Sequence, residues 1–322
     1  MAMPSILAIT VGILLATSPS IAAADFPMRP LQIVVPFTAG GNTDTIARLL
    51  AEHMQDSLKQ PVTVVNRPGA GTNIGAAYVA NSNPDGYTML LNAPASFVIN
   101  QFIFKSLPYD PDTAFAPVCL AARFPNVLVV NPAVGVKAIG ELIAKAKANP
   151  GKIEYAIAGI GATSHLSAAL FAELAGIDIV AVPYKGTSEY LPDLVAGRVA
   201  FAIDNLGPIL PFIQSGKLMA LGVSTKEPVA LLPGVPPIGS VLKGYELSSW
   251  NVLAVPAKTP KEVVNVLSKE CDRIVHLPAV VETMRSFGSE PVGGTPEQTA
   301  QFLESELPRW EAAINAAKIP KQ

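Results

Sequence analysis

The chain has 322 residues, a formal net charge of −2 at pH 7, 50% hydrophobic residues and only 15% charged residues. This balance is typical of a globular protein with a large core and a lightly charged surface. Because no basic patch stands out, neither nucleic acid nor an anionic membrane is an evident partner. The histidines, His53, His165 and His276, lie far apart and lack metal-ligand spacing, so no metal or other cofactor is expected.

Residues 1–24 are predicted to be an export signal. Residues 6–16 form an uninterrupted run of apolar and small side chains, and cleavage after Ala24, the last of three alanines, would leave Asp25 as the mature N-terminus. Residues 1–5 contain no Lys or Arg, which departs from the usual signal. The alternative is an uncleaved anchor, but the apolar run is shorter than the ~20 residues that cross a bilayer.

The chain has two cysteines, Cys119 and Cys271, which are 152 positions apart. Each lies in an apolar pattern, which favours two buried thiols. An oxidising compartment would permit pairing, but the sequence does not bring the two residues within bonding distance.

A strand, a glycine loop and a helix are predicted at the start of the mature chain. Residues 33–35 form a β-branched strand that Pro36 ends, Gly40 and Gly41 make a tight turn, and a helical pattern begins near Asn42. The free N–H groups of a helix start favour an anion, and glycines allow a ligand to approach the backbone. An ordinary βα turn is the alternative interpretation.

Asp44 is predicted to support this loop. It lies in the first turn of the helix, where its carboxylate can accept hydrogen bonds from free amides, and Arg48 is its i+4 partner.

The same pattern continues along the first half. Strands are predicted at 62–66 and 87–91, separated by the glycine loop 67–75. This alternation predicts a parallel sheet with helices on both faces. Ligands of such sheets bind outside the carboxyl ends of the strands, so the loop 92–96 is expected beside the first glycine loop in one pocket.

The apolar stretch 115–130, which is interrupted at residues 123–125, is expected to cross between domains, and residues 127–130 are expected to open the second domain. There the strand 153–157 is followed by a second loop of small residues, 158–164, and by a helix from 165 to 174. Two such loops, one from each half, can hold the two ends of one ligand.

Several polar residues of this half have two interpretations. Thr163 or Ser164 can cap the helix. His165 is interpreted as a capping or packing residue rather than a ligand contact, and Lys185 as a solvated loop charge. Asp204, at the end of a predicted strand, either meets a ligand or caps the next turn, and the sequence leaves both open.

The end of the chain is predicted to return to the first domain through a strand at 250–255. Pro308 should bend the last helix or break it near Glu304. The amphipathic helices that follow the strand are predicted at 260–275, 279–287 and 296–317. The predicted lobes are residues 25–125 plus 250–322, and residues 126–249.

Seven fragments resemble the Bug-type extracytoplasmic receptors, the substrate-binding subunits of tripartite tricarboxylate transporters. They occur in order along nearly all of the mature chain, at residues 29–44, 66–71, 84–88, 107–111, 146–152, 182–186 and 216–218. The first reads Arg-Pro-Leu-Gln-Ile-Val-Val-Pro-Phe-Thr-Ala-Gly-Gly-Asn-Thr-Asp.

The resemblance implies an α/β protein with the two-lobed fold of a type II-like periplasmic binding protein, each lobe a mostly parallel sheet flanked by helices. It further implies a monomeric periplasmic receptor, not an enzyme, that closes on a small carboxylate and delivers it to a membrane permease. Backbone amides and waters of the two glycine loops would hold the ligand. The expected ligand-binding residues are Phe37, Thr38, Ala39, Gly40, Gly41, Asp44, Ser96, Ile157, Gly159, Thr163, Ser164, His165 and Asp204.

The second loop departs from the family pattern. Relatives commonly read Tyr-Ala-Ser-Ser-Gly where residues 155–159 read Tyr-Ala-Ile-Ala-Gly, so two hydroxyls are absent. A polar ligand group buried there without replacement bonds would cost about 1 to 3 kcal/mol for each lost partner. We therefore expect a ligand with an apolar or aromatic distal part, such as a benzoate-like or an aliphatic mono- or dicarboxylate.

Two other functions are alternatives to the receptor. A hydrolase would need an activated nucleophile, but Ser164 and His165 are neighbours whose side chains point apart, and no Gly-x-Ser-x-Gly elbow occurs. An exported sensor that binds the same solute for a signalling partner needs the same cleft, and the sequence does not separate it from a transport receptor.

Overall fold

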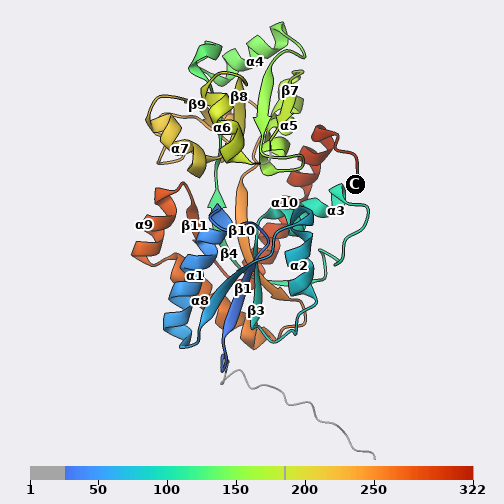
Figure 1. Cartoon of the computed structure of the whole chain (residues 1–322), viewed down its shortest axis with the longest axis vertical. Coiled ribbons are helices and arrows are strands. Elements are labelled where there is room, and N and C mark those ends of the chain that lie inside the picture. Colours follow the sequence, from blue (N-terminus) through green and yellow to red (C-terminus); the bar gives the residue numbers. More distant parts are fainter. Residues whose placement is uncertain (1–25, 185, 322) are drawn as a thin grey trace, which may run out of the picture.

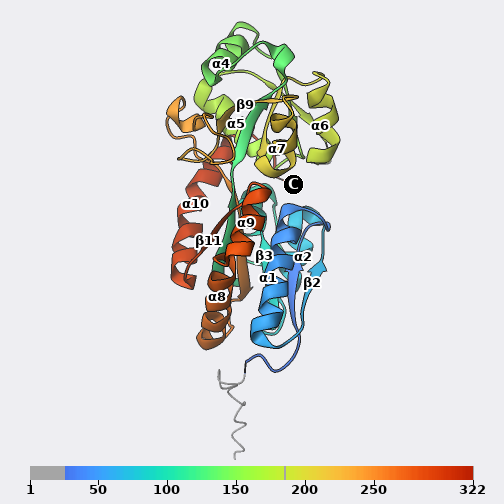
Figure 2. The same cartoon turned by 90° about the vertical axis from the view of Figure 1, so that its left-hand side faces the viewer.

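A computed structural model of the chain describes residues 26–184 and 186–321 (Figure 1). The predicted export signal and Lys185 lie outside the described residues. Within the described ranges, no helix combines the length and the apolar character that crossing a bilayer requires. The elements form two α/β bodies stacked along the long axis of the molecule, as Figures 1 and 2 show.

The first sheet has the strand order β11-β4-β10-β3-β1-β2. β1 pairs in parallel with β2 and β3, whereas β10 runs antiparallel to β3 and β4, so β1 to β4 share one direction. The bounds are β1 Leu31–Val35, β2 Val62–Asn66, β3 Thr88–Asn92, β4 Phe115–Phe124, β10 Ser249–Pro256 and β11 Glu290–Gly293. The predicted strands at 33–35, 62–66, 87–91 and 250–255 are confirmed.

Helices cover both faces of the first sheet, because its strands are apolar on both sides. In β1, Ile33 belongs to the core beneath one set of helices and Val34 to the core beneath the other. One face carries α1 Asn42–Leu58, α8 Lys261–Val275 and α9 Pro278–Ser286, and the other carries α2 Asn73–Ala80 and α10 Pro296–Ala317. A π-helical turn, Ala95–Ile99, and α3 Asn100–Ile103 follow β3.

The second sheet has the order β7-β6-β8-β5-β9. β6 is parallel to β7 and β8, and β5 runs antiparallel to β8 and β9, so only β5 opposes its neighbours. The strands are β5 Asn126–Val130, β6 Glu154–Ile157, β7 Val180–Pro183, β8 Phe201–Asn205 and β9 Met219–Val223. α4 Ile139–Ala148 and α5 Thr163–Ala175 cover one face, and α6 Thr187–Val195 and α7 Leu206–Gln214 cover the other.

The chain passes between the two sheets twice. β4 ends in the first sheet and β5 begins in the second, so Pro125 lies at the crossing that the interrupted apolar stretch predicts. The second crossing leads from β9 into β10. One apolar core joins both bodies, because α10, which follows the first sheet, packs against α5 of the second.

The last helix begins at Pro296 and ends at Ala317, as the sequence predicts. Thr295 caps it: its hydroxyl accepts from Gln298 N–H (3.2 Å) and the Gln298 side chain accepts from Thr295 N–H (2.9 Å). The expected break near Glu304 does not occur, because α10 continues through Pro308.

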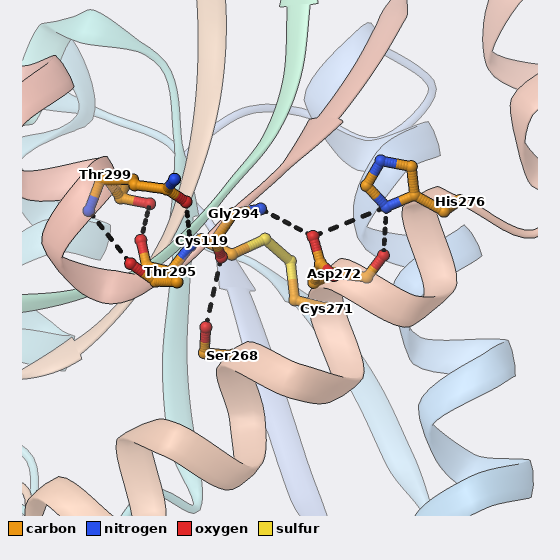
Figure 3. The surroundings of a disulfide bond; sticks show 9 residues. Cys119, Ser268, Cys271, Asp272, His276, Gly294, Thr295 and Thr299 are labelled. Carbon is orange, nitrogen blue, oxygen red and sulfur yellow. Dashed lines mark hydrogen bonds and ion pairs between the residues drawn. A yellow bond between two sulfur atoms is a disulfide. The ribbon is translucent and has the colours of Figure 1, made fainter.

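A disulfide joins Cys119 of β4 to Cys271 of α8, with their Cα atoms 6.4 Å apart (Figure 3). Beside it, Gly294 N–H donates to Asp272 Oδ1 (2.8 Å), which ties the segment after β11 to α8. The prediction of two free thiols is wrong. The apolar patterns did indicate burial, since both cysteines are fully buried, but only the packing of α8 on β4 brings them together.

Candidate functional site

The first glycine loop places an uncapped helix start at the carboxyl end of β1. Gly41 is the N-cap of α1 and no side chain caps the helix. The first bond of the helix ladder runs from Thr45 N–H to Gly41 O (3.0 Å), so the N–H groups of Asn42, Thr43 and Asp44 precede that ladder. These amides carry the positive end of the helix dipole.

Asp44 holds this loop, as predicted. The residue is 2% exposed, and its carboxylate accepts from Gly40 N–H (2.9 Å), Asn66 Nδ2 (2.9 Å) and Arg48 Nε (2.9 Å). Burial alone would raise the pKa of Asp44, but the bonds from Arg48, Gly40 and Asn66 outweigh it and lower that pKa. The negative charge is therefore compensated within the loop.

The second glycine loop is built in the same way at the carboxyl end of β6. Ala162 is the N-cap of α5 without a side-chain bond, and the ladder begins with Leu166 N–H donating to Ala162 O (3.1 Å). The expected cap from Thr163 or Ser164 is wrong. Ser164 lies inside the helix, and its hydroxyl instead accepts from Ala158 N–H (2.9 Å).

His165 reaches back across this loop. Gly161 N–H donates to its Nδ1 (3.2 Å), and the ring is buried. Burial also lowers the pKa of His165, so the neutral imidazole is favoured. This bond holds the loop before α5 rather than capping the helix, and the burial of the ring agrees with the packing role that the sequence offers for His165.

Both loops lie where the two bodies meet. A Cβ added at Gly207, the second residue of α7, would lie 2.5 Å from Phe287 O and 3.7 Å from Asn42 Oδ1. A Cβ added at Gly161 would lie 3.0 Å from Ile103 Cδ1 of the first body. The start of α1 thus adjoins the second body, and the loop before α5 adjoins the first.

Ser96 occupies the π-helical turn after β3 and is 1% exposed. Its hydroxyl shares a hydrogen bond with Thr72 Oγ1 (2.7 Å) and accepts another from Asn92 Nδ2. Ser96 therefore links the segments that follow β2 and β3 in the first body.

Asp204 lies at the end of β8, at the same sheet edge as the second loop because β6 and β8 are parallel. The residue is 2% exposed, and its carboxylate accepts from Thr187 Oγ1 (2.7 Å), Tyr190 OH (2.9 Å) and Asn205 N–H (2.8 Å). Burial raises the pKa of Asp204 although these bonds oppose the shift. Its described bonds therefore fix the start of α6 and the turn after β8.

The remaining predicted residues differ in exposure. Phe37 is half-buried against the first core, whereas residues 38–41 are exposed. Ile157 is buried, and Gly159 and Thr163 are half-buried.

Two asparagines near the loops were missed by sequence reasoning. Asn251 of β10 is 1% exposed; its Nδ2 donates to Thr43 Oγ1 (3.0 Å) and its Oδ1 has no partner among the described residues. Asn205 Oδ1, at the start of α7, is also buried without a described partner. The sequence did contain a signal for Asn251, because it is a polar amide within the otherwise apolar strand that was predicted at 250–255.

Within the part of the chain that the structure describes, no cluster of three or more His, Cys, Asp or Glu side chains could hold a metal ion. The site consists of backbone amides, and around them lie Asp44 paired with Arg48, the imidazole of His165 and the buried, hydrogen-bonded Asp204.

Comparison with known proteins defines the class. The fold matches a structure described as the periplasmic binding protein BugD, with a TM-score of 0.79 and 35% identity over 92% of this chain and 100% of that chain. A structure of R. palustris Rpa4515 with adipate matches with a TM-score of 0.83 and 36% identity over 92% and 100%. A structure of MatC from Rhodopseudomonas palustris with bound malate matches with a TM-score of 0.78 and 30% identity over 90% of this chain and 100% of that chain. The molecule is therefore a two-lobed periplasmic-binding-protein fold.

Residues 46–319 match the family model of the tripartite tricarboxylate transporter family receptor, TctC. Protein BugT of Bordetella pertussis is 36% identical over 311 residues, 94% of this chain and 95% of BugT. A protein of the tcbD-tcbE intergenic region of Pseudomonas sp. (strain P51) is 40% identical over 291 residues, 90% of this chain and 86% of that protein. The chain belongs to the tripartite tricarboxylate transporter receptor family, which confirms the Bug-type resemblance; this is a family of substrate-binding receptors, not of enzymes.

Proposed function

We propose that the chain captures a small carboxylate between two lobes, residues 25–125 plus 250–322 and residues 126–249, and delivers it to a membrane permease. The observation that carries this proposal is the pair of uncapped helix starts, α1 and α5, each behind a glycine loop and each at the junction of the two bodies. Two related receptors were solved with adipate and with malate, which supports a carboxylate ligand here.

Neutral donors would bind the acid. The N–H groups that precede each helix ladder are oriented by the backbone, and the helix dipoles add positive potential. Arg48 already compensates Asp44, so the first loop does not repel an anion, and neutral His165 leaves the second loop uncharged.

The ligand is proposed to have an apolar or aromatic distal part. Ile157 and Ala158 stand where relatives commonly carry hydroxyls, and the neighbouring Ile160 is 63% exposed. An exposed isoleucine in this loop offers apolar contact but no hydrogen bond to a ligand. Aliphatic and aromatic carboxylates should therefore bind more tightly than citrate, and equal binding of citrate and benzoate would contradict this preference.

A thermal-shift screen of the mature chain against adipate, malate, benzoate and citrate tests the receptor role. A ligand that binds only the folded state raises Tm by an amount that grows with the logarithm of its concentration relative to Kd. No shift with any member of a broader carboxylate panel would contradict the proposal. The predicted cleavage of the export signal is tested by the intact mass of the exported protein, which should correspond to a chain that begins at Asp25.

Proline at the first helical position tests whether the amides bind the ligand. Asn42→Pro and Thr163→Pro each remove one N–H donor, and proline is tolerated at that position of a helix. Asn42→Ala and Thr163→Ala are the matched controls because they keep the N–H. Calorimetry should show about tenfold weaker binding for each proline variant, from the loss of one charge-assisted bond. Equal affinities in the proline and alanine pairs would exclude those amides.

Co-purification tests the partner. Capture with a membrane permease is expected for a transport receptor, whereas capture with a sensor kinase domain would favour the sensing alternative.

A further inference from the structure

We propose that His165 is a positioning residue for ligand binding: its neutral imidazole holds the loop 158–162 in its binding shape, and protonation releases that loop. This inference rests on the proposed receptor function. The expected consequence is a receptor that binds its acid at neutral pH and loosens its hold as the pH falls.

The contact is a single hydrogen bond with only one workable tautomer. Gly161 N–H donates to His165 Nδ1 (3.2 Å), so Nδ1 must carry a lone pair and the ring proton must lie on Nε2. A protonated imidazole has no acceptor. It would place two N–H donors opposite each other, and either the ring or the loop must move.

The first loop contains the same contact with a different acceptor. Asp44 accepts from Gly40 four residues before it, and His165 accepts from Gly161 four residues before it. Each acceptor lies at the third position of its helix. Only the histidine changes its ability to accept near neutral pH, because an aspartate stays ionised there.

Gly161, whose amide bonds to His165, lies close to the first body. Gly161 has φ +78°, and a Cβ there would lie 3.0 Å from Ile103 Cδ1 of the first body. The loop therefore has little room to shift towards Ile103. If the bond to His165 is lost, the loop changes its position relative to the first body and to the amides at the start of α5.

The charged groups around α5 do not bond to the imidazole of His165. The buried or half-buried charged groups on β8 and α10, which pack against α5, are Asp204, Glu306 and Arg309. The segment before β10 also contacts α5, because Tyr245 OH donates to Ser167 O (3.2 Å), and its half-buried Glu246 lies 3.3 Å from Arg309 Nη2. Asp204 is bonded to Thr187 and Tyr190, and Glu306 accepts from Arg309 NH1 (2.9 Å). None of these groups has a bond to the imidazole among the described residues, and burial is the cause of the lowered His165 pKa.

A charged imidazole could also attract an anion, which predicts the opposite sign. Burial decides between the two effects, because the desolvation that lowers the His165 pKa opposes a charged ring at this place. Ionisation also removes the acceptor that Gly161 requires. The loss of loop geometry is therefore expected to outweigh the attraction.

The test is calorimetric titration of adipate from pH 8 to pH 5 with three proteins. His165→Asn keeps a δ acceptor that does not titrate, and His165→Leu removes it. Below the imidazole pKa, the Kd of wild type relative to that of His165→Asn should rise, approaching about tenfold per pH unit as the competent fraction falls. His165→Leu should bind more weakly than His165→Asn at every pH. Taking the ratio cancels the titration of adipate itself.

Parallel Kd profiles for wild type and His165→Asn would overturn the inference, and tighter binding of wild type at low pH would assign His165 as a direct anion contact instead. NMR of the unliganded protein gives a ligand-free readout: a proton on Nε2 at pH 8, and a Gly161 amide signal that shifts together with the ring. A proton on Nδ1 would also overturn the inference. If adipate does not bind at pH 8, the carboxylate screen judges the proposed function, and NMR alone judges the role of His165.

Discussion

In the loop before α1, a carboxylate accepts the glycine amide four residues earlier, and in the loop before α5, an imidazole does so. Asp44 is also held by Arg48 and Asn66, so the first loop is fixed by several bonds. The second has the Gly161 bond and the bond from Ala158 to Ser164. Equal backbone geometry can thus be held by acceptors with different pH ranges, which leaves one loop robust and the other adjustable.

The largest stability change should come from outside both loops. Replacing Cys119 and Cys271 by alanine removes a link across 152 positions and should cost about 4 kcal/mol, because the unfolded chain gains freedom. Urea unfolding measures this loss. Adipate affinity should stay within about twofold, since the disulfide joins β4 to α8 and not either loop. A large affinity change would mean that the loops depend on this link.

Removing the first acceptor should have the next largest effect. Asp44→Ala leaves Gly40 N–H and Asn66 Nδ2 without their carboxylate and should cost about 2 kcal/mol of unfolding free energy. Asp44→Asn keeps an acceptor and is the control, with a smaller loss expected. Chemical denaturation at pH 7 compares them. Equal losses would mean that the charge, rather than the acceptor, stabilises the loop.

Alanine at the two glycines should separate backbone strain from interlobe contact. Gly40 and Gly161 both have positive φ, so Gly40→Ala and Gly161→Ala should each lose about 1 kcal/mol of stability. A Cβ at Gly40 meets nothing within 4 Å, whereas one at Gly161 approaches Ile103. Gly161→Ala should therefore bind adipate more weakly than Gly40→Ala. Adding Ile103→Ala should recover part of that loss, and no recovery would contradict the contact.

Acid should destabilise the two loops in different pH windows. The pKa of His165 is lowered by burial, so its neutral form contributes stability above the ordinary histidine pKa of about 6.5 that is lost as the pH falls through the folded value. The pKa of Asp44 is also lowered, so its contribution persists until the pH falls below about 3.9. Urea midpoints from pH 7.5 to 5 should fall more for wild type than for His165→Asn. Equal decreases in the urea midpoints of wild type and His165→Asn would contradict the predicted role of His165 in this pH range.

The smallest expected effect is on ligand preference. Ala158→Ser returns one hydroxyl to the second loop, and Ala158 is half-buried, so the change should be tolerated. The ratio of malate to adipate affinity should rise about fivefold, because one added bond is worth roughly 1 kcal/mol. Calorimetry with both acids measures it, and Ala158→Gly is the control without a hydroxyl. An unchanged ratio would place this side chain away from the ligand.

Local patterns predicted most of the fold. The start of α1 at Asn42, the strand Val62–Asn66 and the limits of α10 follow from apolar periodicity and helix-start signals. The missed elements contain breakers: α7 has Pro211 inside it, β11 contains Pro291 and Gly293, and β7 is an edge strand ending at Pro183.

The candidate site was predictable only where its bonds are local. The bond from Gly40 to Asp44 follows from a carboxylate in a first helical turn, but the equivalent role of His165 does not, because histidine has no such positional rule. The disulfide and the amide of Asn251 depend on which elements pack together over long sequence distances. No local pattern contains that information.

The packing of helix α10 limits how the two bodies can separate. One apolar core contains Trp250 of β10, Trp310 of α10 and Leu166 and Phe171 of α5. Separating the two bodies on the α10 side would therefore expose apolar surface to water. On the opposite flank, Gly207 of α7 adjoins the backbone of Phe287 just beyond α9. We expect the two bodies to rotate about the α10 side when they open, so that they separate beside α7 and the solute enters there.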